Sequence, residues 1–148
     1  MPTPFDFPAR GKILRIENNL VVFAPAGTSY ELHLVPAAAG DLPTPSAQTV
    51  SCHIRATARK IWTMASGGNF VTPIFGTPRI VQGRVRYLEE NLAVIQAGCP
   101  VIVTLPADGT AFDLLNGPLA ATGLVNATLV PGTTIEVVKS AATAVAGT

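Results

Sequence analysis

A long internal repeat is the feature of this sequence that most constrains its fold. The segment Gly11–Val22 returns 72 residues later as Gly83–Val94, with five of twelve positions identical. Similarity continues more weakly from Ala26-Gly27 to Ala97-Gly98. A period of this length exceeds the roughly 20–50 residues of solenoid repeats and matches the size of a small domain. The sequence therefore predicts two similar units in tandem.

Within each unit, short apolar segments rich in Val, Ile and Thr indicate β-strands. The 13 glycines and 13 prolines of the chain separate these segments and supply turns. We expect hairpins at Ser66-Gly67-Gly68 and Pro131-Gly132, a loop over 36–47 and one helical turn at Phe112. The predicted strands are Gly11–Ile16, Leu20–Ala24, Tyr30–Val35, Thr49–Met64 and Asn69–Phe75 in the first unit, and Gly83–Leu88, Leu92–Ala97, Val101–Leu105, Ala120–Val130 and Thr133–Val138 in the second.

Each unit thus consists of a three-stranded meander, a connector and a hairpin, which is typical of a five-stranded OB-type barrel. We predict an all-β protein with two tandem OB-like barrels. The alternative is one larger barrel or sandwich built from both halves. The predicted organisation is an extended N-terminal arm (1–10), a first OB-like barrel (11–76), a linker (77–82), a second OB-like barrel (83–139) and a flexible C-terminal tail (140–148).

The first strand of the two repeats differs in pattern. Arg84-Val-Arg-Tyr87 alternates basic and apolar side chains, as a half-exposed strand does. Lys12-Ile-Leu-Arg-Ile16 does not alternate cleanly. We therefore expect the first copy of this strand to be buried on both faces, against the other half or another subunit.

The composition points to a folded protein that associates with others. Hydrophobic residues make up 48% and charged residues 13%, about half the usual charged share of roughly 25%. Partner subunits that cover part of the surface explain this balance, and so does a surface rich in Thr, Ser, Asn, Gly and Pro. We expect a homo-oligomer, with a further protein partner as an option.

The location expected from the sequence is the cytoplasm, without membrane contact. No segment approaches the roughly 20 apolar residues of a membrane helix, and the N-terminal residues do not resemble a signal peptide. Cys52 and Cys99 lack metal-type spacing, and we expect two buried thiols in preference to a disulfide.

A basic segment offers a second function. Residues Leu42 to Leu88 contain no Asp or Glu, and within the long predicted strand His53, Arg55, Thr57 and Arg59 share one face. Cations along a strand with nearby aromatic rings are typical of single-stranded nucleic-acid binding. The alternative is that these cations pair with acidic groups of the second half or of another subunit. The candidate nucleic-acid-binding residues are Arg55, Arg59, Lys60, Trp62, Arg84 and Arg86.

Catalytic patterns are weak. Only His33 and His53 are of the residue type that acts as a base near neutral pH, and Cys52 and His53 are adjacent in a strand, so their side chains point to opposite faces. We expect no catalytic residue, no metal site, no cofactor and no enzyme activity. The sequence predicts a non-catalytic β-barrel protein that acts in self-assembly or protein–protein interaction, with single-stranded nucleic-acid binding through 53–86 as the alternative.

Overall fold

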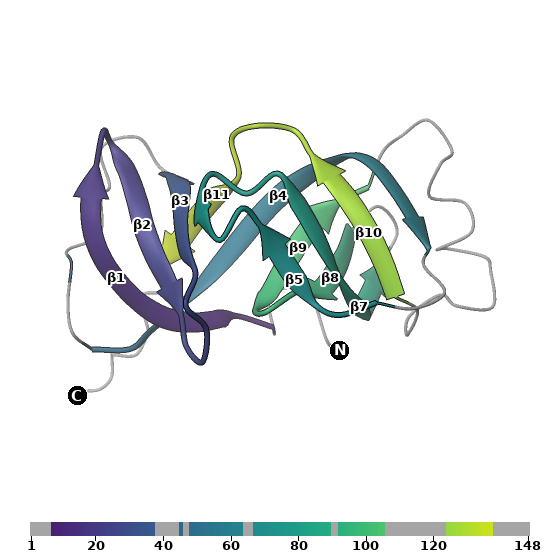
Figure 1. Cartoon of the computed structure of the whole chain (residues 1–148), viewed down its shortest axis with the longest axis horizontal. Helices are drawn as coiled ribbons and strands as arrows, with labels where there is room; N and C mark the ends of the chain where they lie inside the picture. The colour runs from purple at the N-terminus through teal and green to yellow at the C-terminus, as the bar shows by residue number, and fades with distance from the viewer. Residues whose placement is uncertain are drawn as a thin grey trace.

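The computed structural model describes residues 7–37, 45, 48–63, 67–89, 92–105 and 124–137 of the 148. Over these residues the protein is all-β: eleven strands form one mixed sheet, and no helix occurs (Figure 1). The predicted all-β class is confirmed. The predicted helical turn at Phe112, most of the 36–47 loop, residues 1–6 of the arm and the 140–148 tail lie outside the described residues.

Two meanders begin the two halves of the chain. Asn18 and Asn19 form the turn between the first two strands, both with positive φ (53° and 65°), which Asn tolerates better than most residues. The predicted strands of both meanders are confirmed to within a few residues. Their bounds are β1 (Ala9–Glu17), β2 (Leu20–Pro25) and β3 (Glu31–Pro36), then β7 (Ile80–Glu89), β8 (Leu92–Gln96) and β9 (Pro100–Thr104).

The remaining strands do not form the two predicted hairpins. They are β4 (Val50–Thr63), β5 (Phe70–Thr72), β6 (Phe75–Gly76), β10 (Leu124–Leu129) and β11 (Thr134–Val137). β10 and β11 both pair antiparallel with β4, so the chain runs on through Pro131-Gly132 and does not fold back. β5 likewise pairs with β7, and β6 with β3. The hairpin prediction is wrong at both places, because β4 and the β10–β11 segment are long enough to cross from one half to the other.

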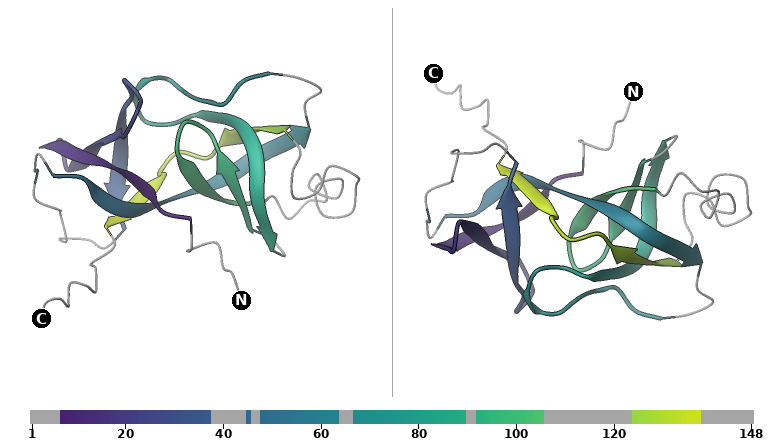
Figure 2. Two further views of the ribbon diagram at one scale, coloured as in Figure 1. Left: turned by 90° about the horizontal axis from the view of Figure 1, so that it is seen from below. Right: turned by 90° about the horizontal axis from the view of Figure 1, so that it is seen from above.

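This crossing closes two rings of five hydrogen-bonded strands that share β4. One ring runs β1, β2, β3, β11, β4 and back to β1, and the other runs β4, β10, β7, β8, β9 and back to β4. β4 traverses the molecule between the two meanders, with β11 and β10 alongside it (Figures 1 and 2). Strands of both predicted units thus lie in one sheet, and the division of the chain at 11–76 and 83–139 stays a prediction.

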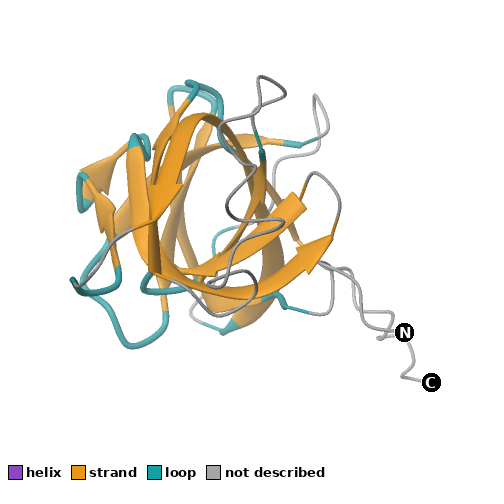
Figure 3. Cartoon of the chain, turned by 90° about the vertical axis from the view of Figure 1, so that its right-hand side faces the viewer, coloured by secondary structure: helices purple, strands orange, loops and turns teal. Residues whose placement is uncertain are grey.

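One hydrophobic core connects the two rings. It contains Phe23 and Leu34 of the first meander, Ile54 of β4, and Ile95 and Val103 of the second meander, each at most 1% exposed. The view along the molecule in Figure 3 shows the strands surrounding this interior. Burial of these apolar side chains is the main stabilising term for such a fold.

The first strand of each meander has a bulge at the corresponding position. The register of β1 on β2 shifts between Ile13 and Arg15, and that of β7 on β8 shifts between Val85 and Tyr87. An extra residue in a bulge turns consecutive side chains outward. The break in alternation at Leu14 therefore comes from a bulge. Leu14 is 38% exposed in the single chain, so the expectation of burial on both faces is wrong within the chain.

Two glycines explain why both meanders bend alike. A Cβ at Gly11 would collide with the backbone oxygen of Ala24, and a Cβ at Gly83 with that of Gln96. The two pairs occupy corresponding positions of the repeat, 72 residues apart. Only glycine permits this close approach of one strand to the next.

The described part of the chain contains no helix that is long and apolar enough to cross a membrane.

β7 begins at Ile80, inside the predicted 77–82 linker, and β1 begins at Ala9, inside the predicted arm.

Candidate functional site

The first part of β4 has the two faces that its sequence predicts. Ile54, Ala56 and Ala58 are buried, whereas Arg55 and Thr57 are exposed and His53 is half-buried. Side chains of a strand alternate between its faces, so the polar residues point away from the core. The basic face of this strand is confirmed as an outward face.

A bulge at Arg59 changes the pattern farther along β4. Ala58 lies opposite Leu129 and Lys60 lies opposite Thr128, which leaves Arg59 as the extra residue. Arg59 and Lys60 are therefore both exposed although they are neighbours in sequence. Without the bulge, Lys60 would share the buried face of Ala58. The alternation then resumes, with Ile61 buried and Trp62 43% exposed.

Two rows of side chains cross the outer face of β4, β10, β7 and β5. The first row consists of Lys60, Thr128, Ile80 and Thr72, and the second of Trp62, Asn126, Gln82 and Phe70. Hydrogen bonds fix the second row, because Asn126 Nδ2 donates to Gln82 Oε1 at 2.9 Å. Gln82 Nε2 in turn donates to the backbone oxygen of Gly68 at 2.9 Å. We refer to this four-stranded surface as the outer face.

The first row forms part of a surface groove of about 980 Å³. We call it the basic groove. This volume is near the upper end of the range of small-ligand sites, roughly 300–1,000 Å³. Its wall combines three cations with threonine hydroxyls and apolar side chains. The groove is lined by Arg59, Lys60, Thr72, Pro73, Thr77, Pro78, Arg79, Ile80, Thr128, Leu129 and Pro131.

The end of β10 lies between the backbone segments that carry Arg59 and Arg79. Leu129 pairs with Ala58 on one side, and on the other its backbone N–H donates to the backbone oxygen of Arg79 at 2.8 Å. Arg59 of β4 and Arg79, which precedes β7, therefore line one groove. Like charges in such proximity raise the local positive potential and attract an anion.

The described residues that line the basic groove include no acid. Among the described residues, the side chains of Arg59, Lys60 and Arg79 form no ion pair. Arg15 of β1 differs, because its Nη2 lies 3.0 Å from Oε1 of Glu31 and its Nε 3.7 Å from Oε1 of Glu17. Arg15 lies outside the acid-free segment, and the pairing of the groove cations with acids of the second half or of another subunit stays a prediction.

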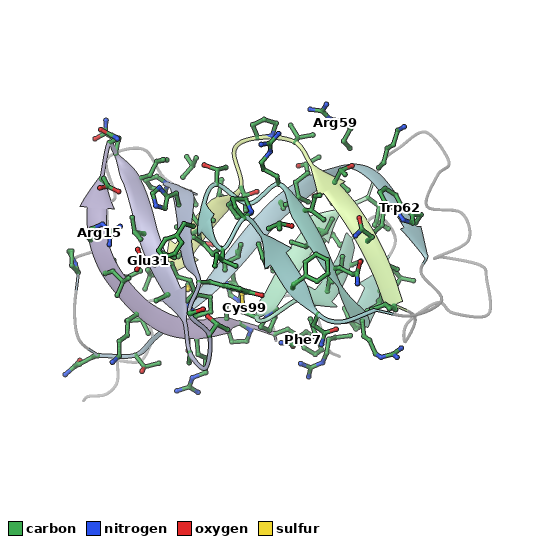
Figure 4. The ribbon with its side chains drawn as sticks, in the orientation of Figure 1. Phe7, Arg15, Glu31, Arg59, Trp62 and Cys99 are labelled. Carbon is green, nitrogen blue, oxygen red and sulfur yellow. The ribbon has the colours of Figure 1, made fainter. Side chains whose placement is uncertain are left out.

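The structure separates the six predicted nucleic-acid-binding residues into two sets. Arg59 and Lys60 line the basic groove, and Trp62 lies in the adjacent row of the outer face. In Figure 4 the labelled Arg59 and Trp62 both project from the half of the molecule that contains β10.

The other three predicted residues lie outside the groove lining. Arg55 lies where β4 passes between β11 and β9, opposite Thr134 and Ile102. Arg84 lies on β7 opposite Gln96. Arg86 is held at the β7 bulge: its Nη1 donates to Gln96 Oε1 at 2.8 Å.

An aromatic residue of the predicted arm also contacts Arg86. The guanidinium carbon of Arg86 lies 5.1 Å from the ring centre of Phe7, a cation–π distance. The Phe7 ring stacks in turn on Tyr87, with ring centres 5.8 Å apart. Arg86 is thus engaged in contacts within the chain.

Sequence reasoning missed Arg79. It belongs to the acid-free segment, but it precedes β7 and lies outside the alternating face of β4. No local sequence pattern indicates that Arg79, which precedes β7, will line the same groove as the bulge residue Arg59 of β4. The pairing of β10 with both β4 and β7 produces this arrangement.

The corresponding pair of residues differs in charge between the two rings. Val50 pairs with Gly11 in one ring, and Val125 pairs with the equivalent Gly83 in the other. His53 and Thr128 each lie three residues after these valines, so they occupy corresponding positions in the two rings. Their partners across the sheet are Glu136 and Lys60, respectively. An acid thus stands in one ring where a cation stands in the other.

Two buried thiols complete the chemically reactive groups. Cys52 and Cys99 are free and buried, which confirms the expected thiols. Burial raises the pKa of both to about 12, and for Cys52 the charge of Cys99 adds to this shift. Among the described residues, no three His, Cys, Asp or Glu side chains lie close enough to hold a metal ion.

Neither a scan against models of known protein families nor a search of curated proteins finds a match to this chain.

Proposed function

We propose that the protein binds single-stranded nucleic acid across its outer face, with the basic groove holding backbone phosphates. The observation that carries this proposal is the combination of three cations without an acidic partner in the groove and an exposed tryptophan in the adjacent row. Proteins of this class combine a positive groove that follows the phosphates with aromatic side chains on which bases stack. Arg59, Lys60 and Arg79 supply the first element and Trp62 the second.

The chemistry of the face supports this assignment. Lys60 and Trp62 are two residues apart on the outward side of β4, a separation of about 7 Å along the strand. A ligand that contacts both must present negative charge and a flat apolar surface at short spacing. A nucleotide has this character.

The fold is consistent with this function. Each ring consists of a meander closed by two further strands, which agrees in strand number with the OB-type barrel. We infer that each ring is OB-like and that the two rings derive from one repeated unit that has exchanged strands. No enzymatic step is part of the proposal.

Binding of oligonucleotides to charge variants tests the proposal. We expect a fluorescent ten-nucleotide single strand to bind the parent protein, and Lys60→Glu to weaken binding at least about tenfold. Trp62→Ala removes the stacking surface and is expected to cost about 1–3 kcal/mol of binding free energy. The measurement is fluorescence anisotropy at low salt.

Lys12→Glu is the matched control, because Lys12 is exposed on β1 and the change in net charge is the same. Its affinity should stay within about twofold of the parent. Equal losses in Lys12→Glu and Lys60→Glu would mean that net charge governs binding, and the outer face would then have no special role.

Self-association is the second candidate function. Ile74 and Phe75 are 45% and 58% exposed beside the groove residue Pro73, and such apolar exposure is typical of contact surfaces. If these two residues form an interface between copies, Phe75→Asp lowers the mass measured by light scattering. A monomeric parent protein would contradict this function.

A further inference from the structure

The basic groove gathers more positive charge than one internal phosphate of a nucleic-acid chain requires. Arg59, Lys60 and Arg79 contribute three cations, and none forms an ion pair within the described part of the chain. An internal phosphodiester carries a single negative charge. A terminal phosphomonoester carries about −1.5 to −2 at neutral pH and offers three acceptor oxygens.

The donors around the groove also suit such a group. Thr72, Thr77 and Thr128 place hydroxyl-bearing side chains in the lining, and arginine presents a planar fork of N–H donors that binds phosphate oxygens in pairs. Among the described residues that line the groove there is no Asp, Glu or His, and Arg59, Lys60 and Arg79 are the charged ones. The attraction therefore increases with the charge of the ligand.

The apolar part of the lining leaves room beyond the phosphate. Pro73, Pro78, Pro131, Ile80 and Leu129 contribute to a groove of about 980 Å³, far more than a phosphate fills. The sugar and base attached to a terminal phosphate can occupy this part, and the following base reaches the row of Trp62 on the same face. The groove thus fits the end of a strand.

We infer that the basic groove recognises a terminal phosphomonoester, so that the protein prefers strand ends that carry a phosphate. This inference rests on the proposed function for its biological ligand, a nucleic-acid strand. The groove itself recognises the phosphomonoester, which a free mononucleotide also carries.

The test compares ten-nucleotide single strands of one sequence with a 5′-phosphate, a 3′-phosphate or neither. Anisotropy of a fluorophore on the opposite end gives the affinity of the full-length protein. We expect one phosphorylated form to bind about tenfold tighter than the unphosphorylated strand, equivalent to about 1.4 kcal/mol. Arg79→Gln should abolish this preference, whereas Arg10→Gln, a matched change on the exposed side of β1, should leave it intact.

Thymidine 5′-monophosphate, thymidine 3′-monophosphate and thymidine, measured by calorimetry, separate this inference from the proposed function. If the three oligonucleotides bind equally well, the inference is wrong and the proposed function stands. If no oligonucleotide binds but either monophosphate binds through Arg79, the groove is a phosphomonoester site and the proposed function is wrong. If none of these ligands binds, both are wrong.

Discussion

At the scale of single residues, the two cysteines show how burial sets chemistry. Cys52 and Cys99 are 0% and 4% exposed, and their pKa values are raised to about 12 from 9.0. A thiol with a raised pKa stays protonated in the folded protein at a pH where the unfolded chain already ionises it. The unfolded state therefore binds fewer protons, and stability falls as pH rises from about 9 to 12.

We therefore expect the free energy of unfolding to decrease between pH 8 and pH 10 by about 1 kcal/mol for each thiol. Urea titrations at the two pH values give this difference. In the double variant Cys52→Ala, Cys99→Ala the unfolding free energy should decrease less between the two pH values, because neither thiol is present to ionise. An identical decrease in parent and variant would show that the thiols ionise equally well in the folded protein.

At the scale of the strand, the bulge in β4 decides which side chains face the solvent. Arg59 is the extra residue between Ala58 and Lys60, which pair with consecutive residues of β10. Deletion of Arg59 should leave these two pairings and the outward position of Trp62 unchanged. Thr57 lies in the part of β4 where side chains alternate regularly between the two faces. Its deletion shifts the following residues by one position, so Arg59 takes the buried position of Ala58.

We expect the protein lacking Arg59 to keep its far-UV circular dichroism spectrum and to melt within about 5 °C of the parent. The protein lacking Thr57 should lose its cooperative melting transition, because a buried unpaired arginine is strongly destabilising. Comparable loss of structure in both deletions would contradict the bulge.

Strand locations were predictable from sequence, but strand partners were not. Val, Ile and Thr segments between glycine and proline indicate where strands occur, and these signals are local. Pro131-Gly132 resembles a hairpin turn, yet β11 continues along β4, because the pairing depends on a strand about 80 residues earlier. Arg59, Lys60 and Trp62 were predictable from the basic strand. The contribution of Arg79 depends on the same long-range pairing.

At the scale of the whole molecule, β4 makes the two rings one cooperative unit. It pairs with β1 and β11 in one ring and with β9 and β10 in the other, and Ile54 belongs to the core that both rings share. Two independent tandem domains would unfold in separate steps, whereas this arrangement requires both rings to open when β4 detaches.

Calorimetry should therefore show a single unfolding transition. Ile54→Ala removes a fully buried side chain and is expected to cost about 2–5 kcal/mol, lowering the temperature of the whole transition. Two resolved transitions, of which Ile54→Ala shifts only one, would indicate independent rings.

The most direct test of the outer face as a nucleic-acid interface is the salt dependence of binding. Fluorescence of Trp62, the single tryptophan of the chain, follows a titration with a single strand at several salt concentrations. Each phosphate contact contributes about −0.7 to the slope of log K against log salt concentration for a single strand. We expect replacement of Arg59, Lys60 and Arg79 together by Ala to make the slope less negative by at least about 0.7, the value for the loss of one phosphate contact. A slope that is the same in the parent and in this triple variant would contradict the account.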